Sequence, residues 1–282
     1  MGALRYFDRA EELFTAASRK VGIANVYRWK GYIYYRANNY RRAFEHLERS
    51  LRIIEEESAP LSDLADTLDI IGRMYRDYAA LVESEREECS RRGEVYEVVG
   101  LSEDQNRLHD AGKEEYLRIG EEYIRKGFEK AEASSDLYKL AEAYLSYVIL
   151  YYSRGEYDAC LASYEEGIAK SQAVDREYHL LLSYYERFAG NAYYNLGEYD
   201  KAFEHFAQRC FHAAHCRAME LGMTMDDIGD KLIGLRSQGN ELRKQCDYLI
   251  NTWNRMKIKV RGEERILGEA YPHLIAMCRN IK

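Results

Sequence analysis

The sequence predicts an all-α protein made of repeated helical hairpins. Among its 282 residues there are only two prolines, Pro60 and Pro272, so helices are rarely interrupted. An aromatic residue followed three positions later by a small residue recurs four times, and a large side chain comes four positions after each copy. The copies are Phe7 and Ala10 with Phe14, Tyr40 and Ala43 with Leu47, Tyr157 and Cys160 with Tyr164, and Tyr199 and Ala202 with Phe206. Such recurrence is typical of stacked helical repeats.

Three hairpins are predicted around the last three copies. They cover residues 25–54, 140–170 and 178–216, and each has a turn signal between its two helices. The turns are Asn38-Asn39, Arg154-Gly155-Glu156 and Leu196-Gly197-Glu198. The small residue of each motif is needed where the second helix crosses the first, because a larger side chain would hold the helix axes apart.

The centre of the chain predicts degenerate copies of the same unit. The intervals between the leading aromatic residues are 33, 117 and 42, and the middle one is about three times 39, so two further copies are expected between residues 44 and 156. The predicted elements there are a helix over 64–78, a highly charged partner over 83–92, a loop over 93–102 and a long helix over 103–133. Asp136 and the serines before it predict a cap for the next helix.

The two ends of the chain depart from the repeat. The first copy supplies only its second helix, so either the array is cut from a longer chain or residues 4–19 form a capping helix. Beyond residue 216 the motif stops; residues 223–260 and 263–280 predict two helices that cap the exposed end of the core. The expected division is 1–92 for N-terminal hairpins, 93–133 for the loop and degenerate helix, 134–216 for two regular hairpins and 217–282 for the cap.

The repeat resembles the tetratricopeptide repeat (TPR) family. Two units match the family pattern in register, and the second of them has Asn38 in place of the turn glycine: Gly190, Tyr193, Gly197, Tyr199, Ala202 and Phe206, then Gly31, Tyr34, Tyr40, Ala43 and Leu47. The resemblance implies a right-handed α-solenoid in which the first helix of each hairpin lines a concave groove. A protein segment bound in that groove is the function it implies.

Residues spaced by three and four on the first helices are therefore the candidate partner-binding residues. They are Asn25, Arg28, Tyr32, Tyr35 and Arg36 in the early unit, Arg73 in the degenerate unit, and Tyr184, Arg187, Asn191, Tyr194 and Asn195 in the late unit. Arginine, asparagine and tyrosine offer forked donors, amides and rigid aromatic surface, which suit peptides and acidic groups. The charges on residues 66–77 could instead pair with each other.

Arg187 and Asn191 resemble part of the carboxylate clamp of TPR co-chaperones. The preceding unit offers Glu142, Leu145, Ser146 and Ile149 at the matching places, which departs from that pattern. A second interpretation rests on analogy alone: irregular TPR arrays also form the effector-sensing arm of multidomain signalling ATPases. Both interpretations predict a binding protein.

Enzymatic and metal functions have weak sequence support. The chain has no phosphate-binding loop, no His-Glu-x-x-His and no Gly-x-Ser-x-Gly, so we expect no enzyme and no cofactor. The one candidate metal site is a cluster of nitrogen and sulfur ligands, His205, His212, His215 and Cys216. Three of them, His205, His212 and Cys216, share one stripe of a helix. This cluster is the basis of a third interpretation, a metal-binding or enzymatic helical protein.

Composition limits the remaining functional classes. A net charge of -7 argues against general nucleic-acid binding, although one basic patch surrounds Trp253: Lys244, Arg255, Lys257, Lys259 and Arg261. The alternation of basic and apolar residues there is more typical of a half-buried edge. The six cysteines show no paired spacing, no signal segment is present, and the longest apolar run is too short to cross a bilayer, so we expect a cytoplasmic protein with no membrane partner.

Overall fold

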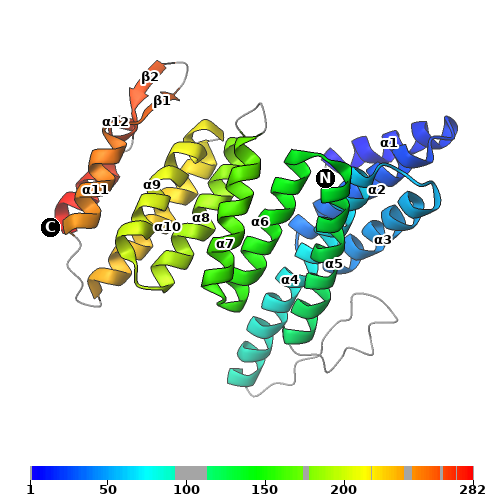
Figure 1. Ribbon diagram of the computed structural model, residues 1–282, viewed down its shortest axis with the longest axis horizontal. Coiled ribbons are helices and arrows are strands. Elements are labelled where there is room, and N and C mark those ends of the chain that lie inside the picture. Colours follow the sequence, from blue (N-terminus) through cyan, green and yellow to red (C-terminus); the bar gives the residue numbers. More distant parts are fainter. Residues whose placement is uncertain are drawn as a thin grey trace. The chain divides into compact units, whose positions relative to one another are not determined.

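The structure, a computed structural model, describes residues 2–92, 113–173, 178–216, 218–237, 243–260, 263–270 and 272–281. It divides into two compact units, Met1–Ser146 and Tyr147–Lys282, which are described separately below. Helices make up nearly all of both units, which confirms the all-α class (Figure 1). Within the described residues, every helix is too short or too polar to span a bilayer.

The first unit begins with three helices that match the sequence pattern. They are α1 (Gly2–Ala16), α2 (Lys20–Arg36) and α3 (Tyr40–Glu56). Helix α3 packs on α2 at Gly31, where a Cβ would lie 2.6 Å from Leu47 Cγ. Asn38 has a φ of 56° in the turn, and the Asn39 side chain accepts a hydrogen bond from the Arg42 amide at 3.3 Å. The predicted hairpin over 25–54 is confirmed.

A long hairpin of α4 (Leu61–Arg92) and α5 (Lys113–Ser134) follows (Figure 1). The prediction of two degenerate copies before residue 156 is therefore wrong, because one long hairpin fills most of that space. Neither glycine nor proline occurs between residues 73 and 92, so the charged stretch continues α4 and does not start a new helix. The predicted loop at 93–102 and the first part of the predicted long helix lie outside the described residues.

Glycines allow α4 and α5 to approach backbone to backbone. A Cβ at Gly72 would lie 2.8 Å from the carbonyl oxygen of Gly120, and a Cβ at Gly120 would lie 2.9 Å from that of Gly72. After α5, Asp136 caps α6 (Leu137–Arg154), because its Oδ1 accepts hydrogen bonds from the Tyr138 and Lys139 amides at 3.0 and 3.1 Å. The predicted cap is confirmed.

The second unit contains the other regular hairpins. Gly155 and Gly197, with φ values of 76° and 79°, form the turns before α7 (Tyr157–Gln172) and α9 (Tyr199–Cys216). Helix α8 (His179–Asn195) packs against both α7 and α9. A Cβ at Gly190 would lie 2.5 Å from Phe206 Cε1, so this glycine sets the approach of α8 and α9.

The C-terminal part differs from the two predicted helices. It contains α10 (Ala218–Ser237), α11 (Arg243–Trp253), a β-hairpin of β1 (Lys257–Val260) and β2 (Glu263–Ile266), then α12 (Leu267–Ala270) and α13 (Pro272–Ile281). The strands are antiparallel, with Lys257 opposite Ile266. Charged and apolar residues alternate over 255–260, and a period of two favours a strand over a helix.

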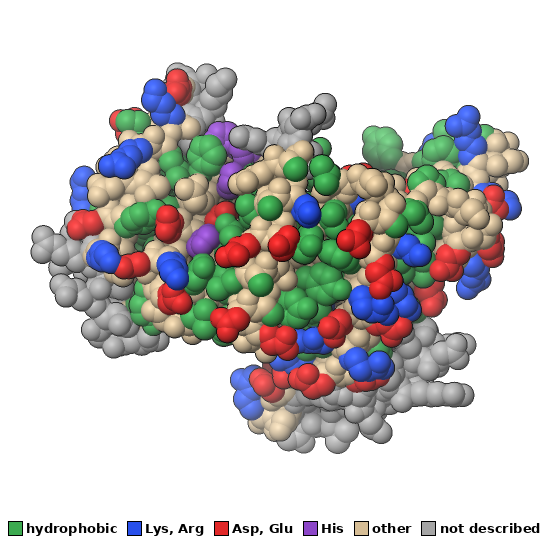
Figure 2. Space-filling model, viewed as in Figure 1, with side chains coloured by type: hydrophobic (Ala, Val, Ile, Leu, Met, Phe, Trp, Pro, Cys, Tyr) green, Lys and Arg blue, Asp and Glu red, His purple; other side chains and the backbone are tan. Residues whose placement is uncertain are grey.

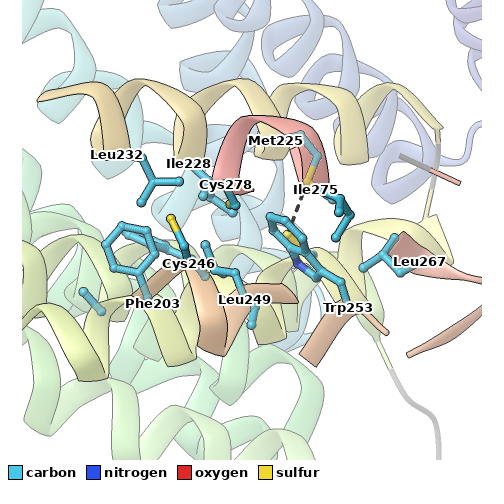
Figure 3. Packing of buried hydrophobic residues seen from close by; sticks show 14 of the residues in the cluster. Phe203, Met225, Ile228, Leu232, Cys246, Leu249, Trp253, Leu267, Ile275 and Cys278 are labelled. Atoms are coloured by element: carbon cyan, nitrogen blue, oxygen red, sulfur yellow. Dashed lines mark hydrogen bonds between the residues drawn. The ribbon is translucent and has the colours of Figure 1, made fainter. Parts of the chain in front are cut away.

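A buried apolar cluster holds α9, α10, α11 and α13 together. The side chains of Phe203, Ile228, Leu249 and Trp253 point toward one another from three of these helices, and Cys278 adds α13 (Figure 3). All of them are almost completely buried. Described residues of α10, α11 and α13 therefore cover the apolar side of α9, as expected of a cap.

Candidate functional site

Arg28, a predicted groove residue, is buried and paired inside the first unit. Its side chain joins α2 to α4, because Nη1 lies 3.1 Å from Asp63 Oδ1 and 3.1 Å from Asp66 Oδ2. Arg28 is only 8% exposed. A cation that already holds two carboxylates has little capacity left for a ligand, so the structure gives Arg28 a structural role.

The charges of α4 also pair with each other and with α6. Asp66 lies 2.8 Å from Lys139 Nζ, which also contacts Glu142 at 3.0 Å. Asp69 lies 3.3 Å from Arg73 Nη1. Burial raises the pKa of the Asp66 carboxyl, although Lys139 and Arg28 act in the opposite direction. Internal pairing of these charges, one of the two alternatives left by the sequence, is the observed arrangement.

The remaining predicted residues of the first unit form an aromatic and polar group. The Tyr35 hydroxyl donates to Asp77, and Arg36 Nη1 donates to the Tyr32 hydroxyl at 3.4 Å. Arg73 lies within electrostatic reach of both tyrosines. The structure therefore brings Tyr32, Tyr35 and Arg73 together. Asn25 is half-buried on the same helix, and its Oδ1 has no hydrogen-bond partner.

Trp29 is a surface aromatic residue that the sequence analysis missed. It is 49% exposed, and its ring lies 5.9 Å from the Tyr32 ring in an edge-to-face arrangement. The spacing of Trp29, Tyr32 and Arg36 by three and four residues could have revealed it, because such residues share one helix face.

In the second unit, Arg187 and Asn191 lie one turn apart on α8, as predicted. Asn191 is 7% exposed and its Oδ1 has no hydrogen-bond partner; the buried Nε of Arg187 has none either. The Arg187 guanidinium lies 5.6 Å from the centre of the Phe188 ring. Among the described residues, no Asp or Glu carboxylate lies within ion-pair distance of the Arg187 guanidinium.

Other predicted residues surround this pair. Asn195 is exposed and its amide donates to the Tyr152 hydroxyl at 3.4 Å. Tyr194 is half-buried against Lys231, whose Nζ lies 5.6 Å from the ring centre. Tyr184 is half-buried farther toward the start of α8. Arg187 also lies within electrostatic reach of Tyr152. The late-unit candidates Arg187, Asn191, Tyr194 and Asn195 therefore lie on the last three turns of α8.

A buried ion pair adjoins this face. Arg209 is 6% exposed and its Nη1 contacts Asp227 Oδ2 at 2.5 Å, while Lys231 contacts Asp227 Oδ1 at 2.8 Å. Burial lowers the pKa of Arg209, and the charge of Arg187 lowers it further, against the effect of Asp227. Arg209 and Lys231 thus share one described carboxylate, and Arg187 adds a third positive charge within electrostatic reach of Arg209, so the area favours an anion.

Acid should destabilise this ion pair. Burial opposes ionisation of Asp227, but hydrogen bonds from Lys231 and Arg209 outweigh it and lower the pKa of the carboxyl below its ordinary value of 3.8. The ionised group thus contributes stability that is present above about pH 3.8 and is lost as the pH falls through the folded-state pKa. Urea unfolding between pH 5 and pH 3 should show a smaller loss of stability in Asp227→Asn than in the wild type. Equal losses would contradict the prediction.

A second network missed by the sequence analysis contains His205. Its Nδ1 lies 2.7 Å from Glu186 Oε2, and the Tyr164 hydroxyl donates to Glu186 Oε1 at 2.9 Å. Glu186 is 7% exposed. His205 also stacks on Tyr193, with ring centres 5.2 Å apart. The network ties α7, α8 and α9 together, and it gives His205 a partner other than a metal.

The residues of the predicted metal site do not lie together, because His205 and the other two histidines have different partners. His205 lies seven residues, or about 10 Å, from His212 along α9. His212 and His215 instead lie near His179, the first residue of α8. Cys216 is half-buried and is not part of a disulfide. In the part of the chain that the structure describes, no three His, Cys, Asp or Glu side chains are grouped to hold a metal ion.

The predicted basic patch is also partly neutralised. Lys244 contacts Asp200, and Lys257 lies 3.4 Å from Glu264 across the hairpin. Arg255 is exposed. The Lys259 side chain and Arg261 lie outside what the structure describes. Acidic and basic side chains are interspersed over the visible face of each unit, so charge is not separated there (Figure 2).

Comparison of the chain with protein-family models and with curated proteins found no match.

Proposed function

We propose that this chain is a non-enzymatic protein-binding module. Its second unit binds an acidic group of an extended partner segment at Arg187 and Asn191, on the face of α8. The observation that carries the proposal is the state of Arg187: its buried Nε has no hydrogen-bond partner, and the described residues place no carboxylate at ion-pair distance from it.

A ligand would satisfy groups that the free chain leaves unpaired. An unpaired buried donor or acceptor costs on the order of 1–3 kcal/mol. A partner group that pairs with the half-buried Arg187, or that reaches Asn191 when the side chains move, recovers part of that cost. Arginine binds carboxylates through two parallel hydrogen bonds, which gives direction as well as strength. Tyr194 and Asn195 extend the same helix face and offer aromatic surface and an exposed amide.

The contrast with the first unit supports this choice of site. Arg28, Arg73 and Lys139 each have carboxylate partners there. Substitution of any of these three residues would disturb the fold, so a loss of binding could not be assigned to the residue itself. The TPR resemblance supports the same function, because it implies a right-handed solenoid whose first helices contact the partner.

A random peptide library displayed on phage can test the proposal. Peptides selected on the wild-type chain should contain Asp, Glu or a free terminal carboxylate. Their affinity should fall at least about tenfold for Arg187→Ala, because a charge-assisted hydrogen-bond pair is lost. The matched control is Arg125→Ala, which removes an exposed arginine paired with Glu129 and should leave affinity unchanged.

Three results would overturn this function. They are the absence of selectable peptides, selected peptides without acidic groups, and equal affinity of the wild type and Arg187→Ala for the selected peptides. Circular dichroism of both variants shows whether a lost affinity reflects binding or folding.

A further inference from the structure

Three histidines gather at one end of the α8/α9 hairpin. His179 is the first residue of α8, and His212 and His215 lie in the last turns of α9. The Nδ1 atoms of His179 and His212 are 3.0 Å apart. The His215 ring lies 4.5 Å from the His179 ring and 4.4 Å from that of Phe211. His179 and His212 are partly buried.

The two facing nitrogens restrict what can lie between them. A neutral imidazole carries one proton, so at 3.0 Å one Nδ1 donates and the other accepts, and two protonated rings would repel each other. A metal ion can replace that shared proton. An ion at the usual Zn–N distance of about 2.0–2.1 Å can touch both nitrogens at this separation. A tetrahedral angle needs the nitrogens to move apart by ~0.3 Å and the rings to turn so that both lone pairs point at the ion.

His215 lies beside this pair but makes a different hydrogen bond. Its Nδ1 lies 2.8 Å from the Phe211 carbonyl oxygen, which can only accept, so Nδ1 carries the proton. Because the described residues form no group of three metal ligands, His215 is not counted as a ligand.

We propose that Nδ1 of His179 and Nδ1 of His212 bind a divalent ion of the zinc class. Water or a side chain of a partner completes the coordination, since the described residues offer no ready group of three ligands. The site differs from the stripe predicted on α9, because its second ligand comes from α8 and because His205 is held by Glu186. It links the beginning of α8 to the end of α9 and so closes the open end of their hairpin.

Calorimetric titration of the full chain with Zn²⁺ at pH 7.5 tests the site, with Mg²⁺ as the ion that prefers oxygen ligands. We expect one equivalent of Zn²⁺ to bind and Mg²⁺ not to bind. His179→Gln and His212→Gln should each weaken the binding at least about tenfold, because one of two protein ligands is lost. The control His205→Gln removes an imidazole of the same helix outside the pair, and its affinity should equal that of the wild type.

Two further measurements keep the inference testable if a variant fails to fold. Binding to the wild type should weaken at pH 5.5, because protons compete for imidazole nitrogens. The electron paramagnetic resonance spectrum of the wild-type chain with one equivalent of Cu²⁺ should show coupling to two ring nitrogens. Zn²⁺ binding no stronger than Mg²⁺ binding, unchanged affinity in His179→Gln, or a Cu²⁺ spectrum with oxygen ligands alone would overturn the proposal.

Discussion

Replacing Arg28 with methionine should lower the free energy of unfolding by about 3 kcal/mol, because removal of one member of a buried ion pair leaves the other charge uncompensated. Asp63 and Asp66 would both lose a partner at 3.1 Å, and Asp66 would keep only Lys139. Methionine retains much of the apolar stem, so the change reports mainly on the charge. Urea unfolding followed by circular dichroism measures the difference.

The control for Arg28→Met is Arg41→Met, which removes an exposed arginine that lies 3.8 Å from Glu45 on the same helix. Surface pairs of this kind contribute little, and the expected change is within about 0.5 kcal/mol. A loss of the same small size in Arg28→Met would contradict the structural role assigned to Arg28 and would return it to the candidate ligand-binding residues.

Replacing Gly72 with alanine should cost about 2 kcal/mol, since overpacking of a close contact outweighs the better helix propensity of alanine. The new Cβ would lie 2.6 Å from Ile124 Cγ1 and 2.8 Å from the Gly120 carbonyl oxygen. A side chain could rotate away, but the Gly120 backbone can move only with α5. The midpoint of urea unfolding measures the loss.

Gly234→Ala is the matched control, because an added Cβ has space at this position. Its Cβ would lie 3.7 Å from the Tyr194 hydroxyl, an ordinary contact distance. Alanine in the interior of α10 should therefore leave stability unchanged or raise it by up to about 1 kcal/mol. Destabilisation of both variants to the same degree would show that the helix approach at Gly72 is not the cause.

The regular hairpins were predictable because their signals are local. Gly31 and Gly190 mark the helix crossings, and Asn38 and Gly197 mark the turns. Each signal lies within about one hairpin of the turn or helix crossing that it determines. It can therefore be recognised in the sequence without knowledge of the fold. Helix α4 was mispredicted for the opposite reason: its charged second half gives no stop signal, and only packing against α5 decides how far it continues.

The site residues were less predictable because their partners lie far away in the sequence. The helix face of Arg28 follows from spacing, but its pairing with Asp63, 35 residues later, depends on the fold. His205 shares a face with His212 in the sequence, yet Glu186 on α8 binds its ring. The strands β1 and β2 were missed although the alternation over 255–260 was visible, because so short an alternating run does not distinguish a paired strand from a half-buried edge.

The chain of charges from Arg28 through Asp66 to Lys139 has a consequence for synthesis of the protein on the ribosome. Helices α2 and α3 can form a hairpin as soon as they emerge, but Arg28 then has neither of its carboxylates, which follow on α4. Asp66 in turn cannot contact Lys139 until the beginning of α6 has been synthesised. The nascent first unit thus gains its ionic contacts in order of emergence, and it reaches full stability only after residue 139 has left the exit tunnel.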